Sequence, residues 1–145
     1  MPLLICKEVF CKQKILKQIS TLLFTLIVTC SYGQTQAEMS NKAYAIYQKA
    51  DKELNAVYKN ILLKYKSDTG FLKNLKNSQR IWITFRDAEL KMKYPEREPG
   101  FYGSIHPMCR ANYLEKLTRE RTETLREWLK EVAEGDACSG SIQTK

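Results

Sequence analysis

His106 is the single histidine of the chain, and therefore the one imidazole available for acid–base chemistry. A Ser-His-Asp hydrolase needs such a base beside its nucleophile. His106, however, stands directly before Pro107 at an expected helix start, where an exposed loop side chain is the simpler interpretation. The sequence contains no His-x-x-x-His pair, no paired cysteine motif and no glycine-rich phosphate loop, which are the patterns that metal and nucleotide sites use. We therefore expect a protein that is not an enzyme, with no catalytic residue, metal site or cofactor.

Acidic residues recur on one side of the segment 107–134, opposite its apolar residues. The row consists of Glu120, Glu123, Glu127, Glu131 and Glu134. Basic residues flank it and supply close pairs such as Lys116 with Glu120 and Arg119 with Glu123. A solvated, salt-bridged helix face explains the row. The alternative is a docking surface for a cationic partner, because five carboxylates on one face make a local negative patch.

A second set of polar side chains lies beside the apolar rows of the expected helices. These residues are Asp51, Asn55, Gln79, Arg86, Asp87, Thr118 and Arg121. Their positions imply partial burial, and a partly buried arginine costs free energy unless it is paired. We expect a structural network in which Asp51 or Asp87 meets one of the two arginines and fixes the helix register. The functional alternative is that this set lines a shallow ligand groove.

Three apolar rows, with steps of three and four residues, predict the amphipathic helices that must position these side chains. The first helix covers 36–65, a stretch without glycine or proline, and its apolar row is Ala43, Tyr47, Ala50, Leu54, Val57 and Ile61. The second covers 71–92, and its inward row is expected to be Phe71, Leu75, Ser78, Trp82, Phe85, Glu89 and Met92. Gly70 should end the first helix in a left-handed conformation. The third helix should open at Pro107 and continue to about Glu134.

Helices joined in this way give an all-α fold, a small antiparallel bundle of three main helices. The connection 93–104 between the second and third helices combines prolines, glycines and aromatics. This composition is typical of an ordered loop packed on the bundle. A length of 145 residues with 43% hydrophobic and 28% charged positions allows one folded domain and excludes a disordered or collagen-like chain.

The N-terminus has the pattern of a signal peptide, because lysines precede an uncharged run at 19–30. That run is too short for a membrane-spanning helix, which needs about 20 apolar residues. Ser31 and Gly33 are the small residues that signal peptidase requires before a cut, so the mature chain would begin at Gln34. Lipidation at Cys30 and an N-terminal core helix are the alternatives, and the long n-region leaves the true start codon open. We expect a signal peptide at 1–33, a helical domain at 34–134 and a flexible tail at 135–145.

Export would place the protein in the periplasm or outside the cell, without a membrane span. The mature chain would keep 20 basic and 15 acidic residues, a net charge of +5 that is interspersed along the chain. This pattern does not indicate nucleic-acid binding. Cys109 and Cys138 would enter an oxidising compartment, but an unbroken helix over 107–134 would hold its ends about 40 Å apart. We therefore expect no bridge within one chain, and free thiols or an intermolecular bond stay open.

Motif fragments along the chain occur in an order that resembles a known family. They are Gln36-Ala37-Glu38-Met39, Asp51-x-x-Leu54-Asn55-x-x-Tyr58, Gln79-Arg80-x-Trp82-x-x-Phe85-Arg86-Asp87, Gly103-Ser104 and Thr118-x-x-Arg121-x-x-x-Leu125. Together they resemble the LprI-like lysozyme-inhibitor domain family of small exported helical bacterial proteins, over about residues 36–129. This family usually carries cysteines near the positions of Lys42, Leu90 and Tyr113. The resemblance implies that Leu90 and Tyr113 replace a disulfide between the second and third helices with apolar packing.

The resemblance implies an exported binding protein that inhibits lysozyme by occluding its cleft, with a host lysozyme or a protein of the cell envelope as partner. Vertebrate lysozymes are strongly basic, so a protein of net charge +5 would need the acidic row for docking. The alternative is a structural or accessory module of the bacterial envelope that has no inhibitory activity.

Overall fold

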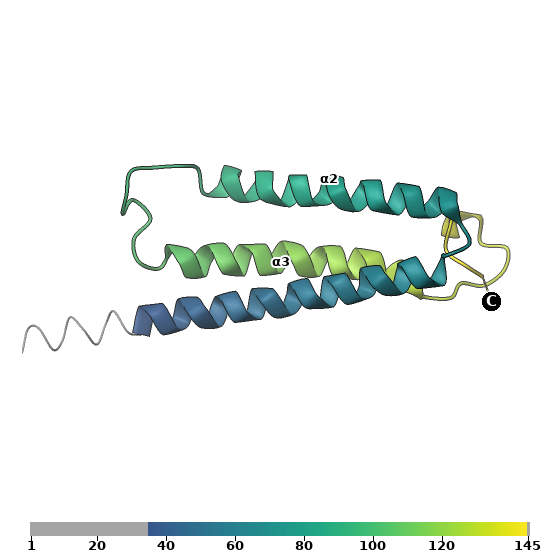
Figure 1. The fold of residues 1–145 in the computed structure, drawn as a ribbon, viewed down its shortest axis with the longest axis horizontal. Coiled ribbons are helices and arrows are strands. Elements are labelled where there is room, and N and C mark those ends of the chain that lie inside the picture. Colours follow the sequence, from purple (N-terminus) through teal and green to yellow (C-terminus); the bar gives the residue numbers. More distant parts are fainter. Residues whose placement is uncertain (1–34, 145) are drawn as a thin grey trace, which may run out of the picture. The chain divides into compact units, whose positions relative to one another are not determined.

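The computed structural model describes residues 35–144, shown as the coloured ribbon of Figure 1. The expected signal peptide and the lipidation site at Cys30 lie outside the described residues. The chain divides into two compact units, Met1–Met39 and Ser40–Lys145. Residues 35–39, the described part of the first unit, are helical.

The second unit is an antiparallel bundle of three helices, as the apolar rows predict (Figure 1). In this unit the first helix covers 40–64, α2 covers Thr69–Lys93 and α3 covers His106–Arg126. Two short 3-10 helices follow, η1 at Glu127–Leu129 and η2 at Ala137–Ser139. Residues 35–144 form no strand, and a single isolated bridge joins Val132 to Thr144. No helix among these residues is long and apolar enough to cross a membrane.

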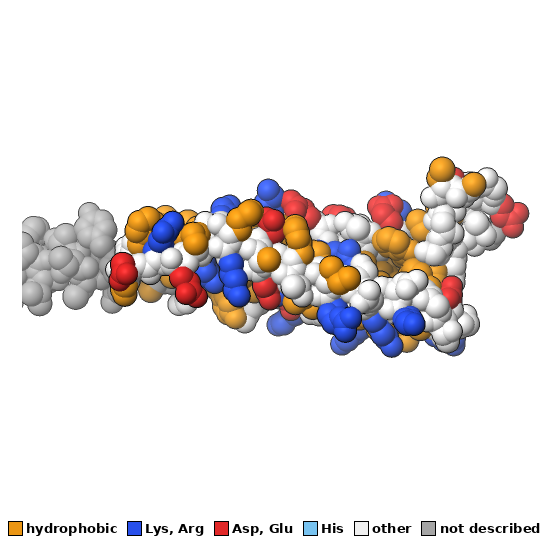
Figure 2. Space-filling view, turned by 90° about the horizontal axis from the view of Figure 1, so that it is seen from above, with side chains coloured by type: hydrophobic (Ala, Val, Ile, Leu, Met, Phe, Trp, Pro, Cys, Tyr) orange, Lys and Arg blue, Asp and Glu red, His pale blue; other side chains and the backbone are white. Residues whose placement is uncertain are grey.

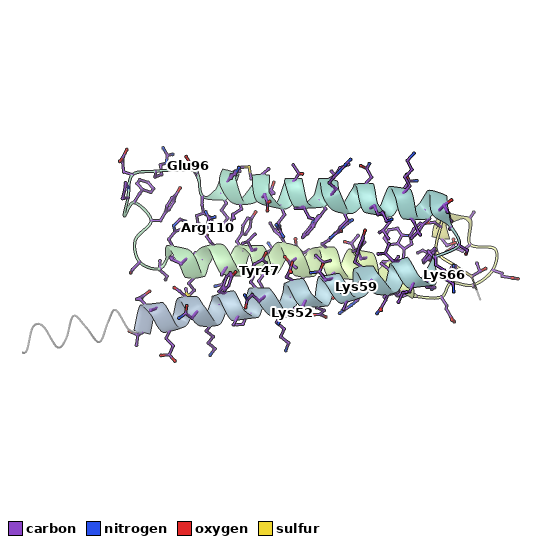
Figure 3. The ribbon with its side chains drawn as sticks, viewed as in Figure 1. Tyr47, Lys52, Lys59, Lys66, Glu96 and Arg110 are labelled. Carbon is purple, nitrogen blue, oxygen red and sulfur yellow. The ribbon has the colours of Figure 1, made fainter. Side chains whose placement is uncertain are left out.

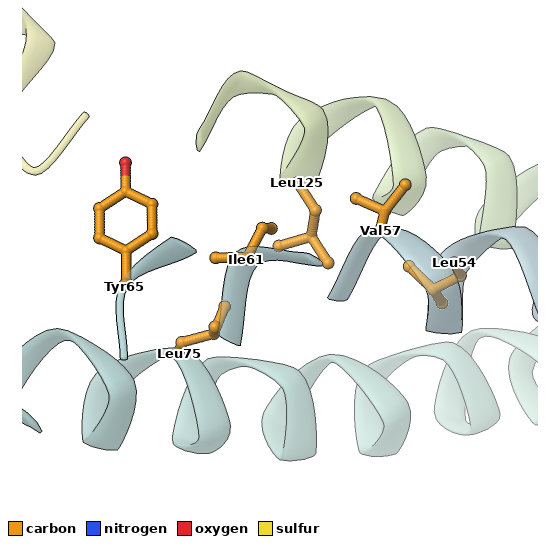
Figure 4. Packing of buried hydrophobic residues seen from close by; sticks show 6 residues of the cluster. All are labelled: Leu54, Val57, Ile61, Tyr65, Leu75 and Leu125. Atoms are coloured by element: carbon orange, nitrogen blue, oxygen red, sulfur yellow. The ribbon is translucent and has the colours of Figure 1, made fainter. Parts of the chain in front are cut away.

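The hydrophobic core lies where the three helices meet (Figure 4). The first helix supplies most of it, because its steps of three and four residues put the predicted row on one buried face. That helix contributes Leu54, Val57 and Ile61, the turn after it contributes Tyr65, α2 contributes Leu75 and α3 contributes Leu125. Ala43 and Ala50 are also buried and continue the row toward the other end of the helix.

The inward row of α2 differs from the prediction at Ser78, which is exposed, and again in the second half of the helix. Phe85 and Met92 were expected inside, yet their exposed fractions are 51% and 69%. Gln79, Arg86 and Leu90 face inward instead, and all three are buried or half-buried. Phe71, Leu75 and Trp82 keep their expected places. The predicted inward row was wrong in this part of α2, because the polar side chains of Gln79 and Arg86 face the other helices here.

The turn between the first helix and α2 is set by Asp68, not by Gly70. The carboxylate of Asp68 caps α2 by accepting a hydrogen bond from the Phe71 amide, with Oδ1 and N separated by 2.8 Å. Gly70 lies inside the first turn of α2 and does not have a positive φ. The prediction that Gly70 ends the first helix was therefore wrong.

The third helix ends earlier than its amphipathic pattern predicts. Regular α-helix stops at Arg126, and Lys130 is extended, with φ −72° and ψ 161°. Tertiary contacts replace the missing helical bonds: the Tyr65 hydroxyl donates to the Trp128 carbonyl at 3.2 Å, and Lys64 Nζ donates to the Lys130 carbonyl at 3.1 Å. The prediction that the third helix continues to Glu134 was wrong, because these contacts join residues far apart in the sequence and local periodicity does not reveal them.

The C-terminal segment folds back over this end of the bundle. The Trp128 indole donates to the Ser141 hydroxyl at 2.9 Å, and the Gln143 amide donates to the Tyr65 hydroxyl at 3.1 Å. The flexibility expected for 135–145 stays a prediction. Cys109 in α3 and Cys138 in η2 are free thiols, and they lie near opposite ends of the bundle.

Candidate functional site

The five glutamates of the predicted acidic row do not share one helix face. Glu120 and Glu123 lie on α3, and Glu127 lies in η1. Glu131 and Glu134 follow the extended residue Lys130, beyond both helices. The expectation of one continuous acidic face was wrong, because the helix that should carry it ends before it is complete.

The first three glutamates are each paired with a neighbouring cation. Glu120 pairs with Lys116 at 3.8 Å, Glu123 with Arg126 at 2.7 Å and Glu127 with Lys130 at 2.6 Å. Arg119 pairs with Glu115 and Glu53, and not with Glu123 as expected. The face is thus a mixture of both signs, and its negative potential is weaker than five free carboxylates would give.

The predicted polar set lies in three separate groups. On the first helix, the Asn55 amide donates to the Asp51 carbonyl and carboxylate at 2.8 and 3.0 Å. On α2, the Arg86 guanidinium pairs with its neighbour Asp87 at 2.8 Å. Between α2 and α3, Arg121 Nε donates to Gln79 Oε1 at 3.1 Å. The last group is the one that joins two helices.

Thr118 and Thr122, one turn apart on α3, are buried and bond within the helix. Their hydroxyls donate to the carbonyls of Leu114 and Thr118, at 2.7 and 2.8 Å. Small side chains here let α3 approach its neighbours closely, while the back-bonded hydroxyls leave no buried donor unpaired. Thr118 is therefore a packing residue of the bundle.

A pocket of about 390 Å³ opens beside Arg121, and we name it the Arg121 pocket. Its lining comes from α2, α3, η1 and the C-terminal segment, and comprises Asp68, Phe71, Asn74, Leu75, Ser78, Arg121, Leu125, Trp128 and Ser141. Figure 2 shows hydrophobic side chains gathered in a hollow next to the protruding segment at this end. Arg121 belongs to the polar set predicted from the sequence. The sequence pattern did not predict that Trp128 and Ser141 would line the same pocket as Arg121.

The loop 94–105, which we name the aromatic loop, forms the opposite end of the bundle. Tyr102 organises it: its hydroxyl donates to the Pro95 carbonyl at 2.8 Å, and its ring lies 5.7 Å from that of Tyr94. Gly100 and Gly103 have φ values of 86° and 69°, which allow the chain to reverse without strain. The loop is ordered, as predicted, and the exposed fraction of Phe101 is 67%.

His106 packs beneath this loop and is half-buried, not exposed. Its ring stacks on Tyr102 at 4.3 Å, and Nε2 is buried without a hydrogen-bond partner among the described residues. Figure 3 shows Glu96 on the loop and Arg110 on α3 at this same end. Among residues 35–144 no nucleophile is hydrogen-bonded to His106, and its ring contacts with Tyr94 and Tyr102 support the loop.

Leu90 of α2 and Tyr113 of α3 are the positions where the resemblance implied a lost disulfide, and Tyr113 contacts Glu89, the residue before Leu90. Leu90 is buried. Tyr113 makes a polar link as well, because its hydroxyl donates to Glu89 Oε2 at 3.0 Å, and Lys93 Nζ lies 3.8 Å from its ring centroid. The bond to Glu89 and partial burial raise the pKa of Tyr113 above its usual value.

Among residues 35–144, no group of three or more His, Cys, Asp or Glu side chains could hold a metal ion. The geometry of these residues places a pocket with one cation at one end of the bundle and a partly apolar loop at the other. These features define a small helical protein whose two ends differ in chemistry.

Comparison with known proteins agrees with this class. The family model described as "Lysozyme inhibitor LprI" matches residues 29–125. An uncharacterized protein of Rhizobium meliloti (strain 1021) is 32% identical over 116 residues, which cover 72% of this chain and 81% of the relative. No solved structure matches. The chain belongs to the LprI family, as the order of its motif fragments predicts.

Proposed function

We propose that this protein is an exported lysozyme inhibitor that acts by binding, with the aromatic loop occluding the catalytic cleft. The observation that carries the proposal is the family match over residues 29–125. Occlusion needs no catalytic residue, and none of the described side chains forms a nucleophile–base pair with His106.

The aromatic loop fits a lysozyme cleft better than the glutamates of α3 do. A lysozyme cleft contains two catalytic carboxylates, one of them beside an apolar wall. The loop presents an aromatic ring with a cation next to it, since the Arg97 guanidinium lies 5.7 Å from the ring centroid of Phe101. Arg97 would approach the carboxylates, and Phe101 would pack on the apolar wall.

The charges around the loop favour the same orientation. Glu96 and Glu98 flank Arg97, so the loop is more acidic than the chain as a whole. This reduces repulsion from a basic lysozyme surface around the cleft. The bond from Tyr102 to Pro95 and the stacking on His106 hold the loop in one conformation, which lowers the entropy cost of docking. The glutamates of α3 are the alternative docking surface.

The test is a titration of the purified protein into a lysozyme cell-wall assay at low and at near-physiological salt. We expect inhibition that saturates at one inhibitor per lysozyme. Undiminished lysozyme activity at high micromolar protein would overturn the proposal and favour the accessory-module alternative. Isolation of a stable complex with an envelope protein would then be the next measurement.

A further inference from the structure

The Arg121 pocket lies at the other end of the bundle from the aromatic loop, so occlusion by that loop does not use it. Its cation is Arg121, whose guanidinium donates to two neutral groups, Gln79 Oε1 at 3.1 Å and Ser78 Oγ at 2.9 Å. No carboxylate among residues 35–144 lies within ion-pair distance of it. An arginine held by neutral partners keeps its full charge facing the pocket.

Two further observations mark this arginine as unusual. Burial lowers the pKa of the Arg121 guanidinium, and no neighbouring carboxylate opposes that shift. Two other arginines of α3 do have acidic partners: Arg119 pairs with Glu115 and Glu53, and Arg126 pairs with Glu53 and Glu123. Arg121 is thus a partly desolvated cation beside an open pocket, which is the arrangement that an anionic ligand would complete.

The residues that line the pocket indicate which kind of anion would fit it. Phe71 and Trp128 stand with ring centroids 6.5 Å apart, and Leu75 and Leu125 add aliphatic surface. A volume of about 390 Å³ lies within the range of small-molecule sites. Asp68 lies in the lining at the start of α2, where it caps the helix. Its negative charge would turn a ligand's anionic head toward Arg121.

We propose that the Arg121 pocket binds a small organic carboxylate with an apolar or aromatic body. The carboxylate contacts Nη1 of Arg121, which has no hydrogen-bond partner among the described residues, and the body packs against Phe71 and Trp128. Ser78, which is also part of the pocket lining, and Gln79 hold the guanidinium in place through their hydrogen bonds from Nη2 and Nε. This site is independent of lysozyme binding at the aromatic loop.

The test uses 3-phenylpropionate as the probe and 3-phenylpropan-1-ol as its neutral counterpart. Binding is followed by the indole N–H signal of Trp128 in proton–nitrogen NMR spectra, because this group donates to Ser141 at the pocket edge. Trp82→Phe assigns the two indole signals. We expect the carboxylate to shift the Trp128 signal saturably and to bind about tenfold more tightly than the alcohol.

Substitutions separate the charge from the pocket. Arg121→Gln should weaken binding of the carboxylate about tenfold and leave binding of the alcohol unchanged. Arg119→Gln on the exposed side of α3 is the matched control and should change neither. Equal affinity for acid and alcohol in the unsubstituted protein would overturn the proposal even if Arg121→Gln fails to fold. The absence of any shift at millimolar probe would overturn it as well.

Discussion

Arg121 of α3 donates from Nε to Oε1 of Gln79 on α2, at 3.1 Å, across 42 positions of sequence. Both residues belong to motif fragments that the sequence carries far apart, and the fold brings them into one contact between helices. The contact is neutral on the α2 side, so Arg121 retains an uncompensated charge. This relationship links the packing of the bundle to its pocket.

Replacing Gln79 with an acid tests that charge. Gln79→Glu should raise the free energy of unfolding at pH 7 by about 1 kcal/mol, because a carboxylate would pair with Arg121. The pairing would lower the pKa of the new carboxyl in the folded state. The added stability should therefore be present above the pKa of this carboxyl in the unfolded chain, about 4.3, and be lost as the pH falls through its lower pKa in the folded state. Urea unfolding at pH 7 and pH 3 measures the added stability. A variant less stable than the unsubstituted protein at pH 7 would contradict this prediction.

Core and surface positions of the helices should respond very differently to truncation. Leu125 is buried in the core, so Leu125→Ala should cost about 2–4 kcal/mol. Phe85 lies on the exposed side of α2, so Phe85→Ser should change stability by less than about 0.5 kcal/mol. Thermal unfolding of both variants checks this. A large loss for Phe85→Ser would restore the inward row that the sequence predicted.

An ion pair between the first helix and α3 offers a third test. Glu53 pairs with both Arg126 and Arg119, and the side chains of Glu53 and Arg126 are a little over one third exposed. A double-mutant cycle with Glu53→Gln and Arg126→Gln should give a coupling of about 0.5 kcal/mol, reduced by solvent screening. The coupling should shrink in 1 M salt. A coupling free energy that does not change with salt would show that Glu53 and Arg126 interact through packing and not through their charges.

Stability should fall in alkali through Tyr113. Its bond to Glu89 stabilises the protonated phenol, so the pKa is raised in the folded state. That contribution is complete below the unfolded pKa, about 10, and is lost as the pH rises through the higher folded value. Unfolding of the native protein and of Tyr113→Phe, measured at pH 8 and pH 11, should show a smaller alkaline loss in the variant. Equal losses in both would assign the effect to other tyrosines.

The fold follows from the sequence where local periodicity and packing agree. The row from Ala43 to Ile61 is apolar, and all of it is buried except the half-buried Tyr47, so it predicts its helix and its face correctly. The glycines and aromatics of the aromatic loop likewise indicate an ordered connection.

The misses share a physical cause, which is that contacts distant in sequence override the local pattern. Tyr65 and Lys64 capture the carbonyls of Trp128 and Lys130, so α3 ends before the acidic row is complete. On α2, the contact with Arg121 favours an inward Gln79. The Arg121 pocket depends on the C-terminal segment, which folds back and brings Ser141 next to Trp128. The sequence pattern therefore predicted Arg121 but not the rest of the pocket lining.

The most direct measurement of the central claim compares two variants in the lysozyme assay. Phe101→Ser together with Arg97→Ser removes the ring and the cation of the aromatic loop, while Glu123→Lys together with Glu127→Lys reverses the charges near the end of α3. Both pairs lie at exposed positions, and unfolding curves should show that each variant keeps its fold. We predict that the loop variant loses inhibition and that the α3 variant keeps it. Loss of inhibition in the α3 variant alone would contradict occlusion by the aromatic loop.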